Sequence, residues 1–191
     1  MAKRTAPDGT SIPRERLLQT ASGLFYQEGI HAVGVDRIVD EAGVTRATFY
    51  RHFPSKEDLV EAYIDGEDAG IRGALAGAEA AIEDPKQLVE AVIEGLADDV
   101  ARHHTRGCPF INAAAEYPDA ASGVRRAVQE HRTWFRAELE RLLAAAGSSD
   151  PEGAAAELVL LRDAAMVGGY LDGWERVLPA FIAAARAAAT R

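Results

Sequence analysis

The sequence predicts an all-α protein of about nine helices, on the strength of three observations. Apolar residues recur every three or four positions along most of the 191-residue chain, which is the spacing of one helix face. Proline and glycine stand between these periodic runs, where helices begin and end. No run alternates apolar and polar residues over the length of a strand, and no internal repeat is visible.

The first three predicted helices form one group. The first has Pro13 in its opening turn, where a missing N–H breaks no hydrogen bond, and it ends at Gly29. Its inner face is expected to be Leu17, Ala21, Leu24 and Phe25. Two short helices follow over residues 35–42 and 46–52, separated by a turn at Gly43. Two short helices joined by such a turn form a helix-turn-helix pattern.

The remaining helices are identified by their boundaries. Pro54 breaks the third helix, and Ser55 with Asp58 predicts a capping box for a fourth, which extends to about residue 81. Asp84-Pro85 opens a fifth helix. Its inner face is predicted to be Leu88, Val92, Leu96 and Val100. The last four helices are expected within 106–118, over 122–146, from 150 onward, and over 174–189.

Charge is distributed unevenly along the chain. The first 56 residues carry eight Lys/Arg and six Asp/Glu, whereas the rest carries 13 and 24. A mildly basic end on an acidic body favours a protein whose N-terminal part alone meets a polyanion. The chain has one cysteine, no segment resembling a signal peptide, and no apolar run near the ~18 residues of a membrane span. We therefore expect a reducing, cytoplasmic location.

The helix predicted over 46–52 has two chemically different faces. At about 100° per residue, Phe49 and Phe53 fall on one side and would anchor the helix to a core. The opposite side offers a small residue, a guanidinium, a phenol and a hydroxyl, namely Ala47, Arg51, Tyr50 and Thr48. Arginine can bind guanine bidentately, alanine permits close approach, and tyrosine and threonine can bind phosphate. This surface predicts a helix that reads double-stranded DNA.

Flanking residues extend the predicted DNA surface. Arg46, in the first turn, can reach a base edge. Thr45 is the expected N-cap, at a helix end whose amides favour an anion. Lys56, at the start of the next helix, is predicted to be a second phosphate contact.

A resemblance to a known family covers roughly the first 60 residues. The segment VDRIVDEAGVTRATFYRHFPSKEDLV, preceded by RERLLQTASGLFYQEGIHAVGV, resembles the DNA-binding domain of the TetR/AcrR family of bacterial transcriptional regulators. The resemblance implies a helix-turn-helix domain over 1–54 and a helical ligand-binding and dimerisation domain over 55–191. Matching positions imply base contacts from Arg46, Ala47, Thr48 and Arg51, and phosphate contacts from Thr45, Tyr50, His52 and Lys56. Gly34 replaces a Thr or Ser that is frequent in the family, so one hydroxyl contact is lost.

Polar and aromatic residues of the second domain suggest a small-molecule pocket. The candidates for its lining are Phe110, Asn112, Glu116, His131, Trp134, Met166 and Tyr170. We expect few buried charges, and the acidic domain disfavours anions. The predicted ligand is therefore a small, largely apolar or aromatic compound that is neutral or cationic. The alternative is that these side chains only fill the core.

The last two long helices predict a homodimer. Apolar and small residues form a stripe along both helices, which could build a four-helix interface. These residues are Leu158, Leu161, Ala165, Gly168, Val177, Leu178, Phe181 and Ile182. The alternative is that both helices close the core of one subunit, and the pair Gly168-Gly169 indicates close helix packing in either case.

Other kinds of site find less support. His103, His104 and Cys108 lack a fourth metal ligand nearby, and a lone cysteine among apolar residues is more often packing than a redox sensor. No catalytic or phosphate-loop motif is present. We expect no enzyme activity, metal or cofactor. The sequence predicts a repressor that a small molecule releases from a palindromic operator, the alternatives being a constitutive DNA-binding regulator and a Cys108-based redox sensor.

Overall fold

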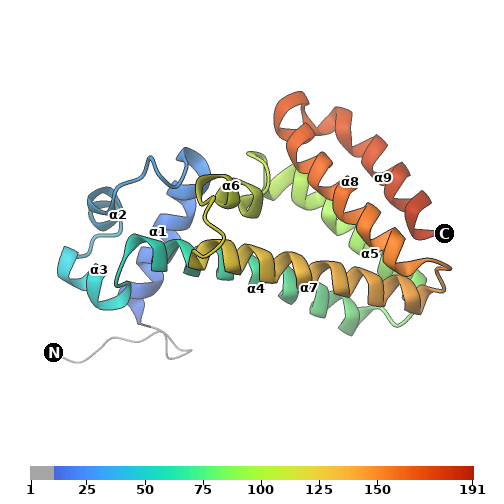
Figure 1. Cartoon of the computed structure of the whole chain (residues 1–191), viewed down its shortest axis with the longest axis horizontal. Coiled ribbons are helices and arrows are strands. Elements are labelled where there is room, and N and C mark those ends of the chain that lie inside the picture. The colour runs from blue at the N-terminus through green and yellow to red at the C-terminus, as the bar shows by residue number, and fades with distance from the viewer. Residues whose placement is uncertain (1–10) are drawn as a thin grey trace. The chain divides into compact units, whose positions relative to one another are not determined.

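The computed structural model describes residues 11–191, and within this range the chain is helical without any β-strand (Figure 1). The start of the predicted domain 1–54, residues 1–10, lies outside the described residues. The helices are α1 (Ile12–Glu28), α2 (Val35–Glu41), α3 (Arg46–His52), α4 (Lys56–Ala81), α5 (Pro85–Asp98), α6 (Pro109–Glu116), α7 (Gly123–Ala146), α8 (Pro151–Asp172) and α9 (Trp174–Ala189). The predicted all-α fold of about nine helices is therefore confirmed over residues 11–191.

One element was not predicted. A short π-helix, η1 (Asp99–His103), continues α5. The predicted inner face of α5 was also partly wrong, because Leu88, Val89, Ile93, Ala97 and Val100 are buried, whereas Val92 and Leu96 are only half-buried. Steps of four residues drift around a helix of 3.6 residues per turn, so a face must mix steps of three and four.

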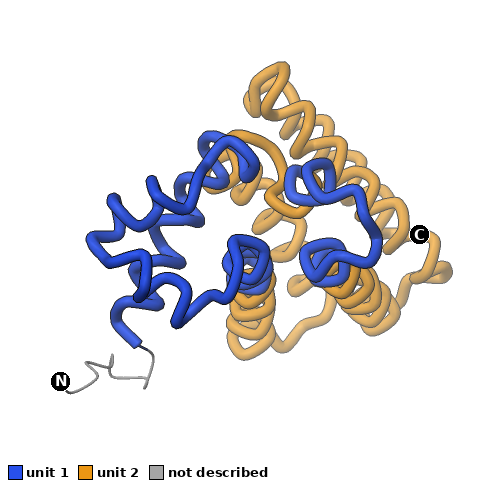
Figure 2. Tube along the Cα trace, turned by 60° about the vertical axis from the view of Figure 1, so that its left-hand side comes forward, with its two compact units in different colours: residues 1–67, 112–128 blue, residues 68–111, 129–191 orange. Residues whose placement is uncertain are grey.

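The chain divides into two compact units (Figure 2). Unit 1 contains the chain up to Glu67 together with Asn112–Val128, and unit 2 contains Asp68–Ile111 and Gln129–Arg191. Helices α4, α6 and α7 each contribute residues to both units. The functional division into residues 1–54 and 55–191 stays a prediction.

The core of unit 1 forms where α1 packs against α2 and α3. The four predicted core positions of α1 are all buried, as are Ile38 and Val39 of α2. The capping box of α4 is present: the Ser55 backbone N–H donates to Asp58 at 2.7 Å, and the Asp58 N–H donates to the Ser55 hydroxyl at 3.1 Å. These local signals fix where α3 ends and α4 begins.

The core of unit 2 is built on the antiparallel pair α8 and α9, with α5 packed against α9 (Figure 1). Gly168 and Gly169, near the C-terminal end of α8, permit close packing there, as predicted. A Cβ atom at Gly168 would lie 3.2 Å from Val177, and one at Gly169 would lie 2.9 Å from Val100. None of the described helices is long and apolar enough to cross a membrane.

Candidate functional site

Helix α3 is held in place by its aromatic face. Phe49 and Phe53 are buried, with ring centroids 6.1 Å apart, and Tyr50 packs edge-on against Phe49 at 5.1 Å while about half of it remains exposed. Thr45 caps the helix, since its hydroxyl accepts the Thr48 N–H at 3.1 Å. The opposite face of α3 is therefore presented at a fixed orientation within unit 1.

Two arginines on α3 are exposed. Arg46 makes an ion pair with Asp36 of α2 at 3.3 Å, and both side chains are well exposed to solvent. Such a pair contributes little stability and is weakened by salt, so the Arg46 guanidinium is available to a stronger anion. Arg51 is exposed and makes no hydrogen bond or ion pair with any residue from 11 to 191. Ala47 is exposed beside them, whereas Thr48 is half-buried.

The other two predicted phosphate contacts have partners inside unit 1. The Lys56 ammonium donates to the Ile30 carbonyl at 2.6 Å and lies 5.9 Å from the centre of the Phe25 ring. Burial lowers the pKa of Lys56, with the charge of Glu116 opposing the shift. The His52 ring lies 3.3 Å from the Ser11 hydroxyl. The hydrogen bond of Lys56 therefore stabilises the turn between α1 and α2.

Glu116, which the sequence suggested for a ligand pocket, instead binds the backbone of unit 1. Its carboxylate accepts the N–H groups of Ile30 at 2.8 Å and His31 at 2.5 Å, and it lies 2.9 Å from Nδ1 of the His31 ring. Burial alone would raise the pKa of Glu116, but the hydrogen bonds from His31 and Ile30 outweigh burial and lower it. Asn112 also belongs to unit 1. Glu116 and Asn112 therefore lie in a different unit from the other predicted pocket residues.

Two of the predicted pocket residues, Phe110 and His131, do meet in unit 2, beside a charged neighbour. The Phe110 ring stacks on His131 with centroids 3.7 Å apart, and the His131 ring also stacks on Phe135 at 5.9 Å. Nδ1 of His131 lies 2.8 Å from the Asp68 carboxylate. Burial lowers the pKa of His131 despite this contact, so the ring is neutral at neutral pH.

The remaining pocket candidates differ in their surroundings. Trp134, 5.9 Å from His131, lies beneath the Arg72 guanidinium at 3.9 Å in a cation–π contact. Met166 is completely buried, whereas Tyr170 is about half exposed. Tyr170 therefore lies off the inner face of α8 that Met166 occupies, and its part in ligand binding stays a prediction.

Arg162 is a buried charged residue that the sequence interpretation did not single out. Only 3% of this α8 residue is exposed. One terminal nitrogen donates to the Cys108 sulfur at 3.0 Å and lies 3.4 Å from Asp163, while its Nε has no hydrogen-bond partner within residues 11–191. The sequence signal that could have indicated a buried arginine is its position four residues after Leu158, on a helix face that is otherwise apolar.

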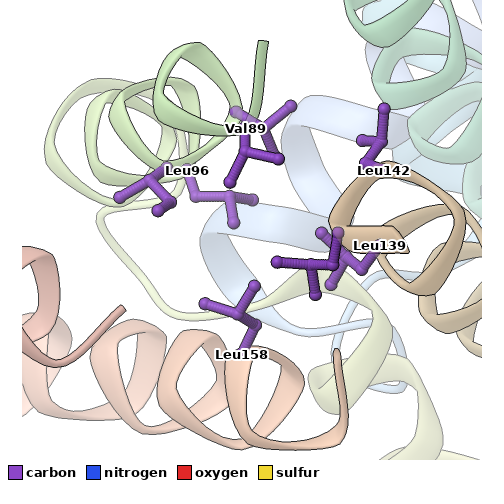
Figure 3. Close-up of a pocket in the computed structure, with 8 residues that line it drawn as sticks. Val89, Leu96, Leu139, Leu142 and Leu158 are labelled. Carbon is purple, nitrogen blue, oxygen red and sulfur yellow. The ribbon is translucent and has the colours of Figure 1, made fainter. Parts of the chain in front are cut away.

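A small apolar pocket lies beside this network in unit 2. Its volume is about 10 Å³, and its lining consists entirely of aliphatic side chains (Figure 3), namely Val89, Val92, Ile93, Leu96, Leu139, Leu142, Leu143 and Leu158. None of the residues predicted to bind ligand lines this pocket. The sequence approach sought polar and aromatic residues and so passed over an aliphatic lining.

The histidines and the cysteine considered as metal ligands are separated. Among residues 11–191 no three His, Cys, Asp or Glu side chains are grouped as metal ligands would be. Nδ1 of His104 lies 2.7 Å from Asp99, and the His103 ring lies 3.8 Å from Asp98. Cys108 is buried against Arg162.

The predicted dimer stripe is partly buried within the chain itself. Leu158, Ala165 and Phe181 are buried within unit 2, and Gly168 is occupied by Val177 of the same chain. Leu161, Val177, Leu178 and Ile182 are half-buried, so the choice between the dimer interface and the core stays a prediction for them. The large apolar side chains that α8 and the start of α9 expose are instead Leu160, Val167, Tyr170, Leu171 and Trp174.

A capped recognition helix in a three-helix head, followed by an all-helical body, defines a helix-turn-helix DNA-binding regulator. Comparison with known proteins specifies the class further. The family model of bacterial regulatory proteins of the tetR family matches residues 17–63, and the model of the tetracyclin repressor-like C-terminal domain matches residues 85–185. The chain belongs to the TetR family of transcriptional regulators.

Individual relatives agree with this assignment. A TetR-family transcriptional regulator from Streptomyces coelicolor, known from its crystal structure, superposes with a TM-score of 0.88 at 46% identity, over 93% of this chain and 94% of that one. The regulator LmrA of Bacillus subtilis is 28% identical over 83% of this chain and 84% of its own length. The transcriptional activator FasR of Mycolicibacterium smegmatis is 32% identical over 63% of this chain, which spans 58% of FasR.

Proposed function

We propose that this protein is a homodimeric repressor that binds a palindromic operator and is released from it by a small molecule. The observation that carries the DNA-binding part is the exposed face of α3, where Arg46, Ala47 and Arg51 stand opposite buried Phe49 and Phe53. A helix anchored in this way can enter a major groove with its arginines toward the bases. A protein with this role acts where the chromosome lies, in the cytoplasm.

The proposed contacts divide into two groups. Arg46, Ala47, Thr48 and Arg51 would lie toward bases, and Thr45, Tyr50 and His52 toward phosphates. Lys56 stands at the start of α4, but its ammonium already donates to the Ile30 carbonyl. Its main contribution is therefore to the turn between α1 and α2 rather than to a phosphate.

The proposed dimer face differs from the predicted stripe and uses the exposed side of α8. Leu160, Val167 and Leu171 are spaced by seven and four residues, which places them along one line of the helix. Leu160 and Leu171 are 68% and 69% exposed in the single chain. A second copy of the chain is the proposed occupant because a palindromic operator requires a two-fold arrangement of heads.

The first experiment identifies the operator. The purified protein selects fragments of its native genome, and the enriched sites are tested by gel shift and by transcription from the neighbouring promoter. We expect an inverted repeat whose binding lowers transcription, and whose release follows addition of a compound that binds unit 2. Enrichment without any inverted repeat would contradict the dimeric model, and increased transcription would identify an activator.

The second experiment tests the dimer face. The double variant Leu160→Glu, Leu171→Glu introduces charges on the exposed line, and we expect it to sediment as a monomer and to lose operator binding. The control is Ala74→Glu, Ala80→Glu, which adds the same charge at exposed positions of α4. If the Leu160/Leu171 variant remains a dimer, or if the unaltered protein is a monomer at micromolar concentration, the proposed face is wrong.

A further inference from the structure

We propose that Arg162 anchors a site in unit 2 for a small monocarboxylate with an unbranched aliphatic tail. The carboxylate would bind the Arg162 guanidinium, and the tail would occupy the aliphatic pocket beside it. The proposal rests on the proposed function in that this ligand would be the effector. It differs from the sequence-based expectation of a neutral or cationic compound, because a buried arginine was not part of that expectation.

The argument starts from the hydrogen bonds of Arg162. Its guanidinium can donate five hydrogen bonds, yet within residues 11–191 it has Cys108 at 3.0 Å, Asp163 at 3.4 Å, and an Nε without a partner. A sulfur is a weak acceptor, and a buried donor without a partner is costly. The free Nε is a buried donor that a carboxylate oxygen could satisfy.

The charges around Arg162 lead to the same conclusion. Its nearest carboxylate, Asp163, is already held by both terminal nitrogens of Arg132, at 2.7 and 3.3 Å. The other nearby carboxylate, Asp68, accepts from Arg72 at 2.6 Å and contacts neutral His131. The three arginines therefore carry one positive charge more than the two carboxylates of Asp163 and Asp68 balance. One added negative charge would balance it.

The aliphatic pocket lies one helical turn from this guanidinium on two helices. Arg162 approaches the Phe135 ring at 6.0 Å, between α8 and α7. One turn earlier on α8 and one turn later on α7, Leu158 and Leu139 line the pocket and point into it (Figure 3).

The size and lining of the pocket define the tail. The lining offers no polar group, so a second polar substituent would lose its hydrogen bonds to water without replacement. The cavity of about 10 Å³ holds roughly one water-sized sphere. A flexible, unbranched chain is the shape that can separate these leucines progressively as it lengthens.

The test measures direct binding without DNA. Hexanoate, octanoate and decanoate are titrated by calorimetry, with octanamide and octylamine as neutral and cationic counterparts of octanoate. We expect carboxylates to bind more tightly as the chain lengthens, and the amide and amine to bind at least about tenfold more weakly, the worth of a hydrogen bond to a charged group. Equal affinity for octanoate and octanamide would overturn the proposal.

Two variants locate the site. Arg162→Met keeps a similar apolar stem and should lower octanoate affinity by about 10- to 100-fold, while Arg136→Met, at an exposed position of α7, should leave it unchanged. Leu158→Trp fills the pocket and should abolish the dependence on chain length. If Arg162→Met does not fold, the Leu158→Trp result decides: a retained dependence on chain length would overturn the site.

Two further readouts separate this proposal from its rivals. If the ultraviolet absorbance of a thiolate is present at neutral pH and disappears in Cys108→Ser, the sulfur itself balances Arg162 and the carboxylate site is overturned. Operator release is measured separately. If carboxylates bind without releasing DNA, the carboxylate site is supported and the ligand-released repressor is refuted. If compounds of another class release DNA and no carboxylate binds, the ligand-released repressor is supported and the carboxylate site is refuted.

Discussion

The two units of this protein use arginine in opposite environments. In unit 1, Arg51 projects into solvent from α3, and Arg46 has only an exposed ion pair with Asp36. In unit 2, Arg162 is almost completely buried among aromatic and aliphatic side chains. A solvated guanidinium contributes little to the fold and can be transferred to DNA, whereas a buried one must be compensated by the protein or by a ligand.

Because of this difference, substitutions in the two units should affect different properties of the protein. In unit 1, removal of an arginine should change DNA recognition and leave folding intact. In unit 2, removal of a counter-charge should change folding itself. Five substitutions test this contrast, in order of decreasing expected effect.

The largest effect is expected for Asp163→Asn in unit 2. The change removes the carboxylate shared by Arg132 and Arg162, and hydrogen bonding to that carboxylate raises the pKa of Arg132. Loss of one member of a largely buried ionic group costs about 3 kcal/mol. Urea denaturation measures the free energy of unfolding. Asp98→Asn, which alters the exposed pair with Arg102, is the control and should be near neutral, and equal effects of both would contradict the contrast.

The next effect is on DNA recognition. Arg51→Ala and Arg46→Ala should each reduce discrimination between operator and random DNA by about 1–3 kcal/mol, the worth of a bidentate base contact. Gel-shift titration measures this, and circular dichroism should show unchanged helicity. Arg37→Ala is the matched control because Arg37 is exposed in the same unit but is bound by Glu28 and Glu41. Unchanged operator affinity for both α3 variants would refute the assignment.

Glu116 tests a half-buried charge within unit 1. Glu116→Gln removes the charge that holds the N–H groups of Ile30 and His31, and we expect a loss of about 1–2 kcal/mol of unfolding free energy at neutral pH. Because folding lowers the pKa of Glu116 below its ordinary value near 4.5, its stabilisation is present above that value and disappears as pH falls through the lowered pKa.

The difference between the unaltered protein and Glu116→Gln should therefore shrink in acid. Denaturation of both proteins across this pH range measures it, with Glu15→Gln at an exposed position of α1 as the control. A difference that stays constant with pH would show that the Glu116 charge has no part in stability.

The smallest effect is expected for Lys56→Met. Loss of the hydrogen bond to Ile30 should reduce the unfolding free energy by about 1 kcal/mol. The salt dependence of operator binding should stay the same, because the ammonium is used inside unit 1. A salt slope that falls by about one would instead identify Lys56 as a phosphate contact.

Local signals in the sequence predicted the helices and the head correctly. Pro13, the Ser55–Asp58 capping box and Gly43 act on their immediate neighbours, so they could be read without knowledge of the fold. The two faces of α3 followed from spacing alone. The same reasoning missed the π-helix η1, because no residue pattern distinguishes it from the α-helix that it continues.

Long-range contacts were beyond such reasoning. Glu116 binds Ile30 and His31 across 86 and 85 positions of sequence, and nothing near Glu116 in the chain indicates that partner. The stripe on α8 and α9 was recognised as apolar, but its spacing could not tell whether the same chain or a second copy would cover it. The structure buries Leu158 and Phe181 within the chain and leaves Leu160 exposed, a distinction that the spacing did not reveal.

The sequence by itself determined the all-helical architecture, the helix-turn-helix head and the chemistry of the α3 surface, because each depends on the period of a helix and on caps a few residues apart. The tertiary structure alone decided the state of Arg162. Whether a guanidinium is solvated or buried depends on helices that meet from distant parts of the chain, here α8 with Phe135 of α7 and with Cys108. Burial converts an ordinary surface residue into a charge that requires a partner.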